Sequence, residues 1–203
     1  MIATGTAHSI DYRGKKLGMW LFLFTELLFF AALFLLYAVF RYQYPQDFHN
    51  AAGHENIVLG TVNTLLLLTS SLTLALSITT IKEAKNRLSA FWQGATIIQG
   101  CIFLVDKYFE WAAKISLGLY PGSPILLERN HGEILYYGLY YVMTGIHGLH
   151  VFLGIAVIAY MVKLTLRGTI TDQDFIKLEN TGLYWHFVDI IWIYLFPLFY
   201  LIT

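Results

Sequence analysis

Long apolar runs alternate with short polar connections along this chain. Five runs reach the roughly 20 residues that an α-helix needs to cross a bilayer, approximately over residues 17–40, 57–81, 88–113, 134–162 and 182–202. Membrane strands would alternate apolar and polar positions, so these continuous runs predict helices rather than a barrel. The expected fold is therefore all-α, a polytopic bundle of five transmembrane helices in a single membrane domain over residues 1–203.

Basic residues are distributed unevenly between the two sides of the expected membrane. The N-terminal arm and the connections 82–87 and 163–181 carry nine Lys and Arg residues, whereas the connections 41–56 and 114–133 carry three. The positive-inside rule therefore predicts a cytoplasmic N-terminus and a C-terminus on the opposite side. The short turn at 82–87 also predicts that the second and third runs are antiparallel neighbours.

The composition supports a membrane protein. The chain is 57% hydrophobic and only 13% charged, whereas soluble domains carry about 25% charged residues. Its formal net charge is zero, so no basic face indicates a nucleic-acid partner.

Ionisable side chains interrupt the apolar runs. Such groups are costly inside a membrane, so each is a functional candidate. Depths counted at about 1.5 Å per residue place five of them together in the inner half of the bundle, namely Glu26, His147, His150, His186 and Asp189. The same count places a second layer toward the outer end of the third run, formed by Asp106, Lys107 and Glu110.

Three interpretations of these groups compete. A haem or di-iron site would need histidines on facing helices or Glu-x-x-His pairs, and no such pair occurs within a run, so no metal site is expected in this chain. A proton path or ion site is the second interpretation. The third, which we favour, is hydrogen bonding between helices. The depths allow a hydrogen bond from Glu26 to His150 or His147.

Several segments of the chain resemble the motifs of one known family. "GIHGLHVFLG" (145–154) and "GLYWHFVDIIWIYLF" (182–196) are similar to its two most distinctive motifs. "LGMWLFLFTELLFFAALF" (17–34) resembles the segment around a buried membrane carboxylate, with Glu26 at its position. Resemblance to the following spans is carried by "VNTLLLLTSSLTLALS" and "DKYFEW". The family that these segments resemble is subunit III of the haem-copper terminal oxidases.

The resemblance implies an accessory subunit without a redox centre or a catalytic residue of its own. The complex would reduce dioxygen to water and pump protons in a bacterial inner membrane, with haem and copper in partner subunits I and II. Phospholipid would lie between the helices of this subunit. Glu26 favours the cytochrome c type, because quinol forms often have Asp there. A quinol oxidase subunit and a stand-alone membrane transporter are the alternatives.

One position departs from the family pattern. Lys107 stands where the family commonly has Glu, three residues before a second carboxylate, which here is Glu110. Either the alignment shifts by one residue to Asp106, or an internal ion pair replaces the acid.

Overall fold

The computed structural model describes the backbone of residues 3–53 and 55–201 and the side chains from residue 12 onward. The long helices are α1 (Ala3–Gln43), α3 (Ile57–Lys82), α4 (Asn86–Ser116), α6 (His131–Leu166) and α7 (Ile176–Phe196). Two short helices, α2 (Pro45–Ala52) and α5 (Pro124–Leu127), and a π-helical turn, η1 (Pro197–Leu201), complete the chain. Five helices are long and apolar enough to cross a membrane, and the described ranges contain no strand. The expected all-α fold with five membrane helices is thereby confirmed.

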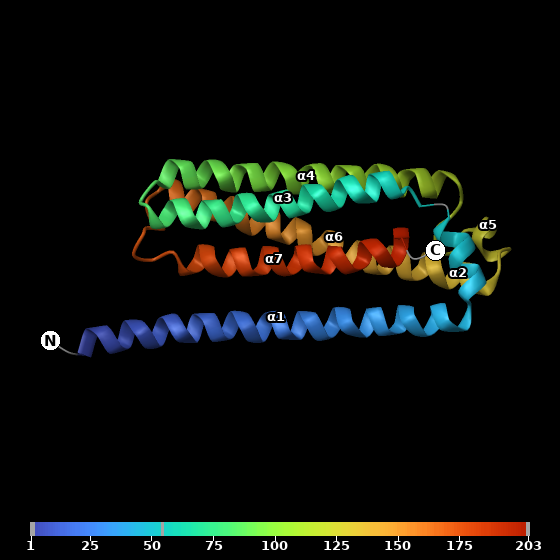
Figure 1. Ribbon diagram of the computed structural model, residues 1–203, viewed down its shortest axis with the longest axis horizontal. Coiled ribbons are helices and arrows are strands. Elements are labelled where there is room, and N and C mark those ends of the chain that lie inside the picture. Colours follow the sequence, from blue (N-terminus) through green and yellow to red (C-terminus); the bar gives the residue numbers. More distant parts are fainter. Residues whose placement is uncertain (1–2, 54, 202–203) are drawn as a thin grey trace.

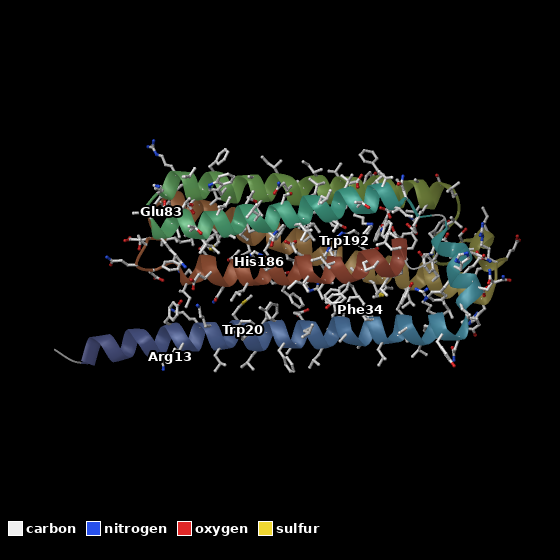
Figure 2. The ribbon with its side chains drawn as sticks, viewed as in Figure 1. Arg13, Trp20, Phe34, Glu83, His186 and Trp192 are labelled. Atoms are coloured by element: carbon white, nitrogen blue, oxygen red, sulfur yellow. The ribbon has the colours of Figure 1, made fainter. Side chains whose placement is uncertain are left out.

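Four of the long helices form one body, and the fifth lies beside it. Helices α3, α4, α6 and α7 pack against one another, while α1 runs along one side of this body against α6 and α7 (Figure 1). Helices α2 and α5 cover one end, which we call the α2/α5 end (Figure 1). The turns that join α3 to α4 and α6 to α7 lie at the opposite end (Figure 1), where Arg13 and Glu83 are also found (Figure 2).

The helices extend beyond the apolar runs. Helix α1 begins at Ala3, so the N-terminal arm is helical rather than a separate segment, and its apolar part spans Tyr12–Gln43. The connections expected to be irregular contain α2 and α5, each of which starts at a proline. Proline suits the first turn of a helix because its missing N–H would be unpaired there. Residue 202, the expected last residue of the fifth run, lies outside the described residues.

Local sequence explains where two of the long helices begin and end. The side chain of Asn56 accepts a hydrogen bond from the backbone N–H of Leu59 at 3.2 Å and so caps the start of α3. Gly168 has a φ of +70° after the end of α6. The N–H groups of Gly168 and Thr169 bond to the carbonyls of Thr165 and Leu164 at 3.1 and 3.0 Å, which closes the helix end before the chain reverses.

Helices α3, α4, α6 and α7 meet around Trp185 of α7. Its indole is fully buried, and its Nε1 donates a hydrogen bond to Ser70 Oγ of α3 at 2.9 Å. A Cβ at Gly100 of α4 or Gly154 of α6 would lie 2.9 or 2.8 Å from the Trp185 ring. Glycine at these positions lets both helices pack directly on the indole, as small residues do between membrane helices.

The antiparallel pairing of α3 with α4 follows a ladder of small polar side chains. Ser89 donates to the carbonyl of Ser77 at 2.8 Å, and Thr73 and Thr96 lie 2.8 Å apart. Farther along, Gln99 Nε2 donates to Thr69 Oγ1 at 3.2 Å. The two helices are therefore neighbours, as the short turn between them predicts.

Candidate functional site

Glu26 of α1, one of the expected polar groups, is paired with His150 of α6. Its Oε2 lies 3.1 Å from His150 Nε2 of α6, so the contact joins α1 to the four-helix body. The other ring nitrogen of His150, Nδ1, lies 2.8 Å from the carbonyl of Ile146. Phe30 packs edge-on against the imidazole, and the Tyr184 hydroxyl donates to the carbonyl of His150 at 3.1 Å. This is the contact between the first and fourth runs that their depths allow.

His147 lies in the centre of the four-helix body and does not contact Glu26. Its imidazole is fully buried, stacks on Trp192 at 5.3 Å between ring centroids and meets the edge of Phe103 at 5.6 Å. Neither ring nitrogen has a hydrogen-bond partner within the part of the chain that the structure describes. The residue is therefore packed as an aromatic side chain.

The polar groups of α7 interact with α3 and not with Glu26 of α1. His186 Nδ1 makes a short hydrogen bond with Ser71 Oγ. Asp189 is buried with its carboxylate beside the same Ser71 of α3, whose hydroxyl is engaged by His186. These two residues thus belong to the interface between α3 and α7.

The expectation that five groups meet in one cluster is therefore wrong, and only Glu26 and His150 meet. Helical geometry explains the separation. Residues three apart differ by about 60° around a helix with 3.6 residues per turn. This angle is enough to direct His150 toward α1 while His147 points into the centre of the body.

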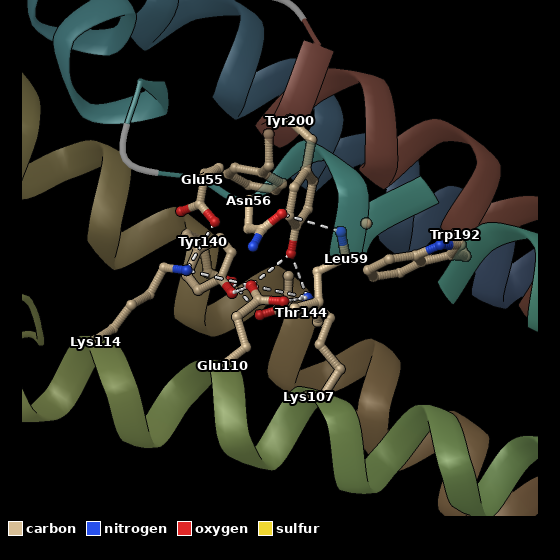
Figure 3. Close-up of polar contacts among 12 residues, drawn as sticks. Glu55, Asn56, Leu59, Lys107, Glu110, Lys114, Tyr140, Thr144, Trp192 and Tyr200 are labelled. Carbon is tan, nitrogen blue, oxygen red and sulfur yellow. Dashed lines mark hydrogen bonds and ion pairs between the residues drawn. The ribbon is translucent and has the colours of Figure 1, made fainter. Parts of the chain in front are cut away.

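The second expected layer contains a buried cluster of charged groups. Lys107 Nζ lies 3.0 Å from Glu110 Oε2, so the internal ion pair is present where the family pattern has an acid (Figure 3). Lys114, one turn farther along α4, lies 3.2 Å from Glu110 Oε1 and 2.7 Å from Glu55 Oε2 in the connection before α3. All four residues are less than 10% exposed. Two ammonium groups thus face two carboxylates inside the α2/α5 end of the bundle.

Two tyrosines complete this charge cluster. Tyr200 of η1 donates to Glu110 Oε1 at 2.6 Å and also receives a short hydrogen bond from Lys107 Nζ. Tyr140 of α6 makes a short hydrogen bond to the same carboxylate oxygen. The ammonium of Lys107 lies 4.7 Å from the centre of the Trp192 ring, which adds a cation–π contact. Helices α4 and α6, the turn η1 and the connection before α3 are therefore held by one network (Figure 3).

Glu55 is the member of the network that lies outside the membrane-spanning helices. Burial raises the pKa of its carboxyl group above the ordinary value of 4.5, and the opposing attraction of Lys114 is smaller. Its Oε1 is buried without a hydrogen-bond partner in the described residues, whereas Oε2 pairs with Lys114.

Sequence reasoning found Lys107 and Glu110 but missed the other four members of this network. Lys114 follows Glu110 by four residues and Lys107 by seven, so helical periodicity would have found it. Tyr140 also lies in a motif-rich helix, but nothing distinguishes it from its tyrosine neighbours. Glu55 and Tyr200 belong to a loop and a π-helical turn, where no regular spacing indicates a partner.

Asp106, the remaining member of the expected layer, is not part of the network. Its Oδ2 is buried and lacks a hydrogen-bond partner among the described side chains and backbone. In residues 12–53 and 55–201, no three His, Cys, Asp or Glu residues are placed to hold a metal ion.

The fold and these contacts define a class, a multi-pass helical membrane protein whose buried polar groups connect its helices to one another. The family model described as cytochrome c oxidase subunit III matches residues 3–203. The chain is 33% identical to cytochrome c oxidase subunit 3 of Thermostichus vulcanus, over 98% of this chain and 95% of that protein. It is 32% identical to the probable quinol oxidase subunit 3 of Staphylococcus haemolyticus, with the same coverage.

The chain belongs to the cytochrome c oxidase subunit III family. It is therefore a subunit of a haem-copper terminal oxidase, a multi-subunit enzyme complex.

Proposed function

We propose that this chain is the accessory subunit of a proton-pumping terminal oxidase of the cytochrome c type in a bacterial inner membrane. Haem and copper lie in its partners, subunits I and II, and this chain stabilises the catalytic subunit during turnover. The observation that carries the proposal is the family match over residues 3–203.

The placement of the polar groups supports a stabilising role. The Glu26–His150, Ser71–His186 and Glu110–Tyr140 contacts each join two different helices. Hydrogen bonds between membrane helices fix their packing. Glu26, His150, His186, Lys107 and Glu110 are thus proposed as structural groups, and His147, Asp106 and Asp189 as buried groups without a chemical step of their own.

The grooves beside α1 are the proposed sites for phospholipid. One cavity of about 390 Å³ lies between α1, α6 and α7 and is lined by Met19, Phe22, Leu153, Val157, Asn180, Thr181 and Tyr184. Another of about 250 Å³ lies between α1 and α7 and is lined by apolar residues of both helices together with His186. Their apolar walls suit acyl chains, and lipid there would fill the space between α1 and the four-helix body.

The identity of the electron donor can be tested on the intact complex. The complex is purified through a tag on this chain, and its haem and copper content and its oxygen uptake with reduced cytochrome c or a quinol are measured. The proposal expects haem, copper and uptake with cytochrome c. Uptake with quinol alone would assign the quinol type, as in the Staphylococcus haemolyticus relative. Purification without haem or copper would contradict the accessory role.

A further inference from the structure

Asp106 is an acidic side chain inside a membrane helix, and it has no hydrogen-bond or ion-pair partner among the described residues. It lies ten residues before Ser116, the end of α4, which corresponds to about 15 Å along the axis. This depth is below the headgroup region of a bilayer. Its Oδ2 is covered by this chain and unpaired within the described residues, but Asp106 as a whole is only half-buried, so part of the side chain reaches the surface of the bundle.

The position of Asp106 around α4 is fixed by Gln99. Gln99 faces α3, where its Nε2 donates to Thr69 Oγ1 at 3.2 Å. Asp106 follows Gln99 by seven residues, two helical turns, and so lies on the same side of α4. The corresponding position on the antiparallel α3 is Val62, seven residues before Thr69. The chain thus pairs Gln99 but not Asp106: α3 presents the apolar Val62 at this level, and the buried amide of the neighbouring Asn63 makes no hydrogen bond to the carboxylate.

Apolar side chains surround Asp106 on the outer surface of these two helices. We call this surface the α3/α4 face, and its exposed members are Val62, Leu65, Ile102, Val105 and Phe109. The nearest cation in sequence, Lys107, is already engaged by Glu110 and Tyr200 on the inner side of α4. Among the side chains that the structure describes, no Lys, Arg or His pairs with Asp106.

The outward surface of α1 differs in this respect. Its exposed residues around the middle of the helix include the apolar Leu21, Phe24, Leu28 and Leu35, and the exposed Thr25 already donates its hydroxyl to the carbonyl of Phe22. Such a surface needs nothing beyond lipid tails. A surface that contains an unpaired carboxylate needs a donor, and lipid tails have none.

We propose that the α3/α4 face is the surface on which a transmembrane helix of a partner subunit of the oxidase docks, and that this helix presents a cation or hydrogen-bond donor to Asp106. The inference rests on the proposed assembly with the catalytic subunit. Charge complementarity selects the occupant: a Lys, Arg or His side chain, or a neutral donor, at the depth of Asp106 pairs the carboxylate. The described exposed members of this face are apolar, so a second copy packed through it would add another carboxylate at the same depth and no cation.

The first experiment locates the neighbour of the face. A photoreactive p-benzoylphenylalanine replaces Ile102 or Val62 in the full chain, within membranes that contain the assembled oxidase. Leu28 on the outward surface of α1 is the matched control. The crosslinked peptides from Ile102 and Val62 are expected to come from one transmembrane segment of a partner subunit that carries a donor within one turn of the crosslink. The control is expected not to reach that segment.

The second experiment separates docking from folding. Asp106→Leu is expected to reduce the amount of this chain retained in the detergent-purified complex by about tenfold, because it leaves the partner's donor unpaired. Asp106→Asn keeps an acceptor and is expected to retain an intermediate amount. In the isolated chain, Asp106→Leu is expected to leave the thermal midpoint unchanged or higher, since it removes an unpaired carboxylate. Val105→Leu is the control and is expected to change neither quantity.

Two outcomes would overturn the inference while leaving the accessory function intact. One is crosslinking from Ile102 and Val62 to lipid alone or to a second copy of this chain in a complex that still contains haem and copper. The other is an equal loss of stability of the isolated chain and of the complex in Asp106→Leu. Purification of this chain without any oxidase subunit would instead contradict the proposed function itself.

Discussion

Glu26 Oε2 and His150 Nε2 lie 3.1 Å apart and join α1 to α6. The carbonyl of Ile146 can only accept, so Nδ1 of His150 carries a proton. A hydrogen bond between Glu26 and Nε2 then needs a second proton, on either the imidazole or the carboxyl group. In both arrangements the pair has no net charge, which lowers the cost of placing it in the membrane.

Loss of this contact should loosen α1 without stopping oxygen reduction. Hydrogen bonds between membrane helices contribute only about 0.6 kcal/mol on average, so Glu26→Gln and His150→Ala should each lower the stability of the subunit by about that amount. We expect normal initial oxygen uptake and a faster loss of activity during sustained turnover. The time course of uptake measures this, with Thr25→Ala as a control on the same helix. Immediate loss of uptake in a fully assembled variant would show that the pair takes part in the chemistry.

Substitutions in the charge cluster at the α2/α5 end should destabilise the subunit more than substitutions elsewhere. Glu110→Gln removes the carboxylate that lies between Lys107 and Lys114, and breaking a buried ion pair costs about 3–5 kcal/mol. Addition of Lys107→Met should recover part of this loss, because it removes one of the uncompensated charges. Unfolding of the subunit in detergent measures both variants. Glu83→Gln at the exposed pair with Lys85 is the control, with an expected change below about 1 kcal/mol.

Glu55 gives the stability of the subunit a defined dependence on pH. Because burial raises its pKa above 4.5, the folded chain binds this proton more tightly than the unfolded chain. The stabilisation that comes from this bound proton is complete at pH values below the pKa of Glu55 in the unfolded chain. It is lost as the pH rises through the higher pKa of Glu55 in the folded chain. Relative to the unaltered chain, Glu55→Gln should therefore gain stability as the pH rises above 4.5. Thermal midpoints of both proteins over this range test the sign, and the opposite slope would show that the attraction of Lys114 outweighs burial.

The close packing around Trp185 predicts different effects for two glycines of α6. A Cβ at Gly154 would lie 2.8 Å from the buried indole, so Gly154→Ala should destabilise the subunit by about 1–3 kcal/mol. A Cβ at Gly138 meets nothing within 4 Å, so Gly138→Ala should have no effect or stabilise by up to about 1 kcal/mol. Thermal unfolding in detergent compares the two, and equal effects would contradict the packing at Trp185.

The orientation of the bundle is a prediction from the distribution of basic residues. The end at which Arg13 and the α3–α4 turn lie (Figure 2) carries the excess of Lys and Arg and should face the cytoplasm. A reporter enzyme that is active only outside the cytoplasm, fused after Thr203, should be active. Activity of the same reporter in the turn at 82–87 would show the reverse orientation.

The sequence was sufficient for the membrane helices because their signal is length and apolarity. It was insufficient for α2, whose mixed composition in a polar connection gives no periodic signal. Helix α1 also begins earlier than its apolar run, since polar residues continue a helix as readily as apolar ones do when no proline interrupts it.

For the buried polar groups, depth could be predicted but direction could not. Counting residues from the helix ends placed Glu26 and His150 at the same level, and the structure joins them. The same count placed His147 beside them, yet its position around α6 directs it toward Trp192. That direction depends on how α6 is rotated against its neighbours, which one sequence does not record.

The distance along the chain between Glu26 and His150 has a consequence for biosynthesis. The two residues are 124 positions apart, which is roughly 6–25 s of translation at about 5–20 residues per second. During that interval α1 has left the ribosome and entered the bilayer while α6 does not yet exist. The nascent protein must therefore hold a carboxyl group in the membrane without its histidine, and α1 relies on its leucine- and phenylalanine-rich surface, or on the insertion machinery, until α6 arrives.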